Sequence, residues 1–266
     1  MHCYSKETSI ILDSIYTKYH KFEYIHPDPL EFLSNYKNPE DMEIVALIAS
    51  SFAIGRVQSI LQTIEIILKV LKSPKNDLMS LNRNEMELAF VGFKYRFYTD
   101  NGLVDFLMGI KNVIGEFGSL HKCFLEGIKK TDSDSLGSLS YFVSKLTNNI
   151  TSGKRVLPDP EKGSACKRLN LFLRWMVRKD DIDPGIWADI PKDILIIPLD
   201  THMMQISQIL GFTSRKSADM KTAIEITDAL KQYDSVDPVR FDFSLTRLGI
   251  HPDLNYDELY ILVNNK

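Results

Sequence analysis

The chain has 266 residues, of which 44% are hydrophobic, so it can bury a sizeable core as one or two compact units. Its formal net charge is −3, whereas most nucleic-acid-binding domains have an excess of basic residues. No run of eighteen apolar residues is present and the N-terminus has no signal-peptide profile, so a membrane protein is not expected.

Cysteine and histidine spacing argues against metal and disulfide chemistry. Cys3, Cys123 and Cys166 are odd in number and widely spaced, which is unsuited to a disulfide framework or a cysteine-based zinc site. The six histidines show no His-x-x-x-His spacing, so no metal site is predicted. A reducing, cytoplasmic compartment is expected.

Helical periodicity runs through almost the whole chain, divided by Pro, Gly and Asn/Asp clusters. One short apolar run, 194–197, has the composition of a strand, but a single run makes no sheet. The predicted fold class is therefore all-α. Helices are expected over residues 6–24, 40–54, 57–72, 84–91, 101–115, 119–129, 135–149, 165–179, 200–210, 217–232, 238–248 and 256–263.

Residues 93–98, FKYRFY, mix aromatic and basic side chains. Sites that bind single strands or a flipped base have this mixture. It is also typical of a partly buried helix edge, and we favour that interpretation.

The segment from residue 163 to residue 202 carries the strongest chemical signal. Lys167 lies in the first turn of an expected helix, and Asp200 can cap the helix that begins after it. Near a helix N-terminus the macrodipole disfavours an ammonium, which favours the nucleophilic neutral amine. A lysine and an aspartate that face one cleft suit nucleophilic and acid–base chemistry.

The helix that begins at Lys167 is expected to be amphipathic. On a helical wheel Leu171, Arg174 and Arg178 share the face of Lys167, and the opposite face is apolar. Between residues 154 and 179, eight basic residues stand against two acidic ones. Such a patch can contact phosphates. The alternative is a solvated basic face without a specific role.

This part of the chain resembles the helix-hairpin-helix and Gly/Pro-Asp signature of base-excision DNA glycosylases. The resemblance lies in Gly163 to Lys167, the run 194–197 and the Pro-Leu-Asp-Thr-His sequence that ends at His202. In that superfamily a lysine after the hairpin attacks C1′ of the damaged nucleotide and an aspartate assists. The resemblance places Lys167 and Asp200 at these two positions. Residues 163–249 resemble most an uncharacterised bacterial family related to the archaeal 8-oxoguanine glycosylases.

The resemblance implies that the protein binds double-stranded DNA with a flipped damaged base, and it implies further residues that contact this substrate. Asp242 would accept a hydrogen bond from a purine N–H; the open alternative is an exposed carboxylate paired with an arginine. His202 can line the cleft, although a structural role is favoured. The other implied substrate-binding residues are Leu171, Arg174 and Thr246, and the implied DNA-backbone residues are Gly163, Ser164, Arg168 and Arg178.

Two departures from the superfamily pattern matter. The turn at 160–165 reads Pro-Glu-Lys-Gly-Ser-Ala, so a glutamate stands in the turn whose glycine-rich backbone binds a DNA phosphate in relatives. No cysteine follows Cys166, so the iron–sulfur cluster of many relatives is not expected, and no other cofactor is predicted.

The resemblance also implies two lobes with a central cleft. A helical barrel over 40–199 would carry the hairpin and Lys167, and a second lobe from 1–39 and 200–266 would carry Asp200 on the opposite wall. The predicted function is base-excision DNA repair by a monomeric DNA glycosylase/AP lyase that acts on a damaged base, an oxidised purine among the candidates. A catalytically inactive nucleic-acid-binding module of the same fold and a helical protein-interaction scaffold remain open.

Overall fold

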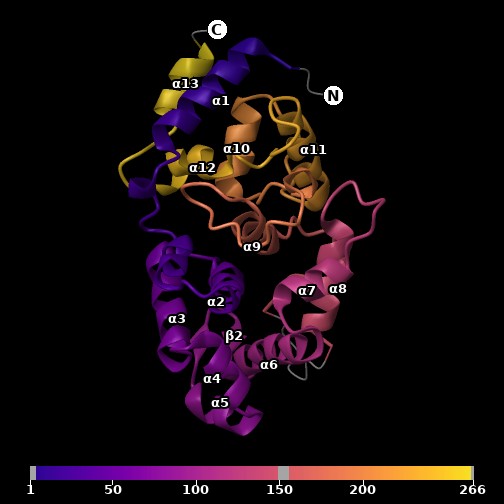
Figure 1. The fold of residues 1–266 in the computed structure, drawn as a ribbon. Coiled ribbons are helices and arrows are strands. Elements are labelled where there is room, and N and C mark those ends of the chain that lie inside the picture. Colours follow the sequence, from indigo (N-terminus) through magenta and orange to yellow (C-terminus); the bar gives the residue numbers. More distant parts are fainter. Residues whose placement is uncertain (1–3, 149–155, 265–266) are drawn as a thin grey trace. The chain divides into compact units, whose positions relative to one another are not determined.

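The computed structural model describes residues 4–148 and 156–264, and helices make up most of them (Figure 1). The predicted all-α class is confirmed. A helix lies within or close to each expected range, and the structure adds short helices that were not predicted: η2 (Pro29–Asn35), α4 (Pro74–Ser80), η3 (Pro160–Lys162) and η4 (Lys192–Ile194). No helix in the described ranges is long and apolar enough to cross a membrane. Residue 149, where the 135–149 helix was expected to end, and the basic residues Lys154 and Arg155 lie outside the described residues.

The chain forms two compact units, which differ in extent from the predicted lobes. The terminal unit comprises residues 1–27 and 162–266, and the middle unit comprises residues 28–161. Lys167 and Asp200, which were expected on different lobes, therefore belong to the same unit. The physical reason is that buried ion pairs join the helix after Lys167 to the C-terminal part of the chain, as described below.

The middle unit is built around a buried helix, α2, in which residues 43–52 are all buried. The carboxylate of Glu43 on this helix accepts hydrogen bonds from the backbone N–H groups of Leu120 and His121 at 2.9 and 3.1 Å, so a buried charge caps α7. The elements are η2 (Pro29–Asn35), α2 (Pro39–Phe52), α3 (Val57–Val70), α4 (Pro74–Ser80), α5 (Arg83–Ala89), β1 (Lys94–Tyr95), β2 (Tyr98–Thr99), α6 (Asp100–Phe117), α7 (Leu120–Glu126) and α8 (Leu136–Leu146).

The aromatic-basic run 93–98 forms a β-hairpin, so its interpretation as a helix edge is wrong. Tyr95 pairs with Tyr98 in an antiparallel ladder, and both rings are buried while the residues between them are exposed. Arg96 adopts a φ of +54°, which reverses the chain. Thr99 then caps α6. Local turn formation overrides helical periodicity here.

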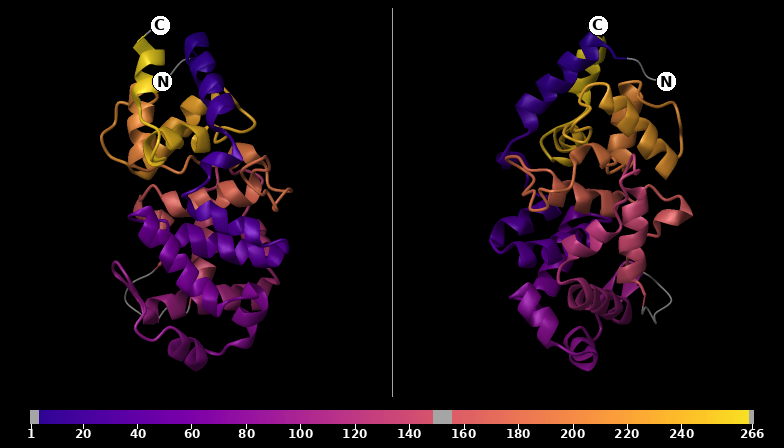
Figure 2. Two further views of the ribbon diagram at one scale, coloured as in Figure 1. Left: turned by 90° about the vertical axis from the view of Figure 1, so that its left-hand side faces the viewer. Right: turned by 45° about the vertical axis from the view of Figure 1, so that its right-hand side comes forward.

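The terminal unit contains α1 (Lys6–Tyr19), η1 (Phe22–Tyr24), α9 (Lys167–Val177), η4 (Lys192–Ile194), α10 (Thr201–Ile209), α11 (Met220–Lys231), α12 (Asp242–Ile250) and α13 (Asp257–Asn264). The short helix η3 (Pro160–Lys162) spans the boundary with the middle unit. Helix α12 packs against α1 and α10, and α1 lies beside α13 (Figures 1 and 2). Residues 195–197 are buried and form no strand, and the two-residue hairpin strands are the only sheet in the described part of the chain.

Candidate active site

Lys167 and Asp200 meet in the terminal unit. Lys167 is the first residue of α9, and Asp200 is the N-cap of α10, as the sequence predicts. The Lys167 Nζ atom lies 3.7 Å from Asp200 Oδ2. The side chains are 28% and 20% exposed, so a solute can reach both. The structure thus brings together the two residues that were predicted to carry the chemistry.

The two carboxylate oxygens of Asp200 have different neighbours. Oδ1 accepts hydrogen bonds from the backbone N–H groups of His202 and Met203, at 3.0 and 2.9 Å. Oδ2 is the oxygen that faces the Lys167 amine. The cap fixes the direction of the carboxylate, and one oxygen remains available for proton transfer.

Substitution of Asp200 separates these two roles. Asp200→Ala removes the cap and is expected to lower the free energy of unfolding by about 1 kcal/mol, whereas Asp200→Asn keeps an oxygen acceptor and should cost a few tenths of that. Denaturant unfolding followed by tryptophan fluorescence measures both. Equal losses in the two variants would show that the cap is not what the side chain contributes to stability.

The turn before Lys167 is hydrogen-bonded to the start of α11. The carbonyl of Gly163, a residue with φ +75°, accepts a hydrogen bond from Met220 N at 3.1 Å. The Ser164 hydroxyl accepts from Cys166 N at 3.3 Å, and Cys166 has a left-handed φ of +47° that few non-glycine residues adopt. Gly163 and Ser164 are exposed and Arg168 is half-buried. These three predicted DNA-backbone residues therefore flank Lys167 along the chain.

The predicted outward basic face of α9 is wrong. Arg174 and Arg178 are only 4% and 2% exposed, and Leu171 is buried as well. Residues 169–177 are all buried, so the helix has no solvated side along this stretch. The two arginines therefore belong neither to a basic patch that contacts phosphates nor to a solvated face without a specific role. In this structure Arg178 is not presented to a DNA backbone.

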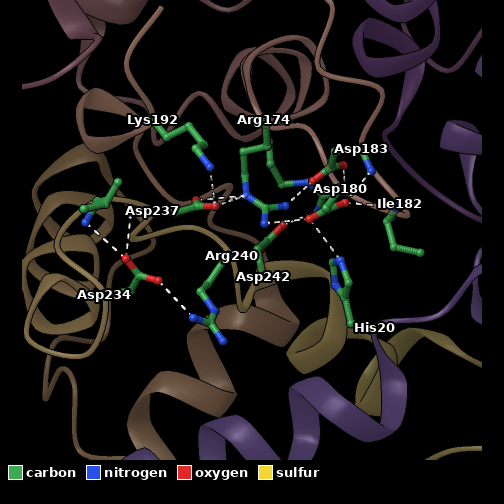
Figure 3. A network of polar contacts seen from close by, with 12 residues as sticks. His20, Arg174, Asp180, Ile182, Asp183, Lys192, Asp234, Asp237, Arg240 and Asp242 are labelled. Atoms are coloured by element: carbon green, nitrogen blue, oxygen red, sulfur yellow. Dashed lines mark hydrogen bonds and ion pairs between the residues drawn. The ribbon is translucent and has the colours of Figure 1, made fainter. Parts of the chain in front are cut away.

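Carboxylates that pair with the two arginines explain why both lie inside, and Figure 3 shows the network around Arg174. Arg174 donates from Nε and Nη2 to Asp183 Oδ1 at 3.2 and 3.1 Å. Arg178 donates from Nε to both oxygens of Asp237, at 2.9 and 3.0 Å, and from Nη1 to Asp183 Oδ2. Arg178 Nη2 also lies 2.8 Å from Asp180. Buried guanidinium groups are tolerated because carboxylates pair with them.

Asp242 joins this network through Arg174. Its Oδ2 accepts a hydrogen bond from Arg174 Nη1, and its side chain is 3% exposed. Burial raises the pKa of Asp242 to about 6 against the lowering effect of Arg174, and the charges of Asp200 and Lys167 also act on it. The pairing with an arginine, one of the two open interpretations, is present, but the carboxylate is buried and not exposed.

The second oxygen of Asp242 has no such partner. Oδ1 is buried and accepts no hydrogen bond from any residue that the structure describes. An unsatisfied buried acceptor costs roughly 1–3 kcal/mol. The nearby Thr246 hydroxyl does not supply it, because it donates to the backbone carbonyls of Asp242 and Phe243. Thr246 is thus a buried residue that bonds its own helix.

His202 and Tyr256 form a second polar contact beside Asp200. His202 Nδ1 and Tyr256 Oη lie 2.7 Å apart. Burial, and then the charge of Asp200, raise the pKa of Tyr256. Gly249 makes room for this pair, since a Cβ atom there would lie 2.1 Å from Tyr256 Oη and 2.3 Å from His202 Nδ1.

Gly249→Ala is accordingly expected to break the His202–Tyr256 contact and to lower the free energy of unfolding by about 1–3 kcal/mol through overpacking. Thermal unfolding followed by circular dichroism measures the loss. Gly115→Ala is the matched control, because Gly115 also lies in a helix but has open space around its Cβ position. A Gly249→Ala protein as stable as the Gly115→Ala protein would contradict the crowding argument.

Sequence reasoning missed Asp183, Asp237 and Tyr256. Asp183 belongs to the Asp-Asp-Ile-Asp run at 180–183 that begins two residues after the second buried arginine, which is the one signal that pointed to it. No group of three or more histidine, cysteine, aspartate or glutamate side chains suited to a metal ion occurs within residues 4–148 and 156–264.

One protein-family model matches residues 28–251, most of the chain; its description reads "Protein of unknown function (DUF2400)". The chain belongs to the DUF2400 family. The matched region of this DUF2400 protein includes Lys167, Asp200 and Asp242, and leaves α1 and α13 outside. Neither the curated proteins nor the solved structures contain a match to the chain.

Proposed function

We propose that this DUF2400 protein is a DNA glycosylase/AP lyase in which Lys167 is the nucleophile and Asp200 its acid–base partner. The observation that carries the proposal is the 3.7 Å approach of Lys167 Nζ to Asp200 Oδ2 at two helix N-termini, with both side chains partly exposed to solvent. Amines and carboxylates in this arrangement suit covalent catalysis at a carbon that bears a leaving group. The substrate class comes from the resemblance described above.

The first chemical step removes the damaged base. Asp200 Oδ2 takes a proton from the Lys167 ammonium, and the free amine attacks C1′ of the extruded nucleotide. The N–C1′ bond forms as the glycosidic bond breaks, and the departing base takes up a proton. That proton comes from Asp200, and the carboxylate is then negative again and stabilises the positive charge on the sugar.

The second step is the lyase reaction. After the sugar ring opens, the Lys167 nitrogen and C1′ form an iminium, which acidifies the protons at C2′. Loss of a C2′ proton expels the 3′-phosphate by β-elimination, and water then hydrolyses the imine and releases the lysine. Asp200 is the carboxylate nearest to the nitrogen, so it is the base we assign to proton movements there.

Asp242 is the residue that we expect to recognise the base. Its buried Oδ1 accepts no hydrogen bond from the described residues, and an N–H of a purine would satisfy it. The charges of both Lys167 and Asp200 act on this carboxyl, which supports assigning it to the same site. A buried acceptor left unpaired in the absence of substrate discriminates strongly against bases without the matching donor.

A cleavage assay tests the proposal. Purified protein is incubated with otherwise identical duplexes that carry 8-oxoguanine, an abasic site or undamaged guanine. We expect cleavage of the damaged duplexes, slowed by about 10²–10⁴-fold in Asp200→Asn, which keeps the helix cap but cannot accept the proton. Salt-dependent binding without cleavage would indicate the inactive nucleic-acid-binding module, and no binding would indicate the interaction scaffold.

A further inference from the structure

We infer that Arg174 and Asp183 are positioning residues that hold Asp242 beside the Lys167–Asp200 pair with one carboxylate oxygen left for a ligand N–H. The inference rests on the proposed function for the identity of that ligand. It concerns two residues to which neither the sequence nor the family assigns this role. The contacts that support it all lie in the terminal unit.

Arg174 is held from one side and holds Asp242 on the other. Its Nε and Nη2 both donate to Asp183 Oδ1, so one edge of the guanidinium is fixed, and Nη1 is directed to Asp242 Oδ2 (Figure 3). A planar guanidinium bound along one edge cannot rotate without losing both bonds. Its third nitrogen, Nη1, is therefore directed at Oδ2 of Asp242, and Oδ1 has no hydrogen bond from the described residues.

Asp183 is itself fixed from two directions. It is fully buried; Arg178 Nη1 donates to its Oδ2, and its backbone N–H donates to Asp180 Oδ1 at 2.8 Å. Arg178 in turn donates two hydrogen bonds to Asp237, which lies shortly before α12, the helix that begins with Asp242. The network thus sets the start of α12 against α9, the helix that begins with Lys167.

The charges around Asp242 make the arrangement testable. From α9, Arg174 and Lys167 favour its ionised form, and from α10 the carboxylate of Asp200 disfavours it. The next residue on the same helix is Phe243. Its ring makes cation–π contacts with Arg174 and Arg247, and it meets the ring of His20, the C-cap of α1, edge to face. Asp183 neutralises part of the Arg174 charge. Removal of Arg174 and removal of Asp183 should therefore shift the Asp242 titration in opposite directions.

Carboxyl-carbon NMR titration of Asp242 in the full chain is the experiment. We expect the native group to titrate at about 6, because burial raises its pKa. In Arg174→Gln the midpoint should rise by about one pH unit or more, because the cation is lost. In the isosteric Asp183→Asn it should fall, because Arg174 then acts on Asp242 alone. Lys192→Gln is the control, since Lys192 lies at the far edge of the network, 3.7 Å from Asp237, and should leave the midpoint unchanged.

Equilibrium binding of 8-oxoguanine and undamaged duplexes gives the second readout. Only ionised Asp242 can accept through both oxygens, so the native preference for the lesion should fall as the pH drops through about 6. The Arg174→Gln protein should lose the preference at higher pH, and the Asp183→Asn protein at lower pH. A purely structural network would change stability but would not move these curves in opposite directions.

The outcomes separate the inference from the proposed function. Opposite shifts of the Asp242 titration support the positioning role, even if the native protein shows no lesion preference, a result that would overturn the proposed function alone. An unchanged midpoint, or shifts in the same direction, would overturn the positioning role. Should Arg174→Gln fail to fold, the direction of the shift in Asp183→Asn decides the question.

Discussion

Arg174→Ala is expected to lower the free energy of unfolding by about 3–5 kcal/mol, the largest stability effect that we predict. The substitution leaves Asp183 and Asp242 buried without the cation that both contact. Denaturant unfolding followed by tryptophan fluorescence is a suitable measurement. The chain has two tryptophans, Trp175 and Trp187, and both are buried in the terminal unit, so the signal reports on this network.

Lys192→Ala provides the matched control for this loss. Lys192 contacts the same network through Asp237, but its side chain is 39% exposed and the distance is 3.7 Å. Solvent screens such a pair, and we expect a change below about 1 kcal/mol. If Arg174→Ala were no more costly than Lys192→Ala, the guanidinium would not be the group that makes burial of the two carboxylates tolerable.

Lys167→Ala is expected to reduce single-turnover strand cleavage at an abasic site by at least about 10³-fold, the largest effect on activity that we predict. The variant has no amine at the site that can form the iminium. Its fold should be retained, because the Lys167 side chain is 28% exposed and its ion pair with Asp200 is only partly shielded from solvent. DNA affinity measured by fluorescence anisotropy should fall by about tenfold at most.

Lys162→Ala is a control for the loss of one positive charge. Lys162 precedes the same turn and is exposed, but it does not lie at the start of α9. We expect it to weaken binding slightly and to leave cleavage nearly unchanged. Equal losses of cleavage in both variants would mean that charge, not a nucleophilic amine, is what Lys167 supplies.

Most of the helices were predictable from the sequence because caps and breakers mark their ends. Asn38-Pro39 begins α2, Asp200 begins α10 and Gly118 ends α6. The hairpin at 94–99 was not predictable in the same way. Its two strands have two residues each, too few for an alternating pattern to stand out against helical periodicity.

The approach of Lys167 to Asp200 was predicted from their places at two helix starts together with the superfamily resemblance, whereas the burial of α9 was not. A helical wheel records only residues of one helix, and it assigned Arg174 and Arg178 to a solvated face. The carboxylates that bury them come from 180–183 and 237–242, segments that meet α9 only in the folded unit. The same long-range ion pairs explain why the predicted boundary before Asp200 differs from the observed division of the chain.

Borohydride trapping on a duplex with an abasic site, followed by peptide mapping of the adduct, is the most direct test of the lysine chemistry. Reduction converts the iminium into a stable secondary amine between the protein and the sugar. We predict a covalent adduct with the native protein, located on the peptide that contains Lys167 and absent from Lys167→Ala. An adduct on another lysine, or no adduct while the native protein still binds the duplex, would contradict the assignment of Lys167 as the nucleophile.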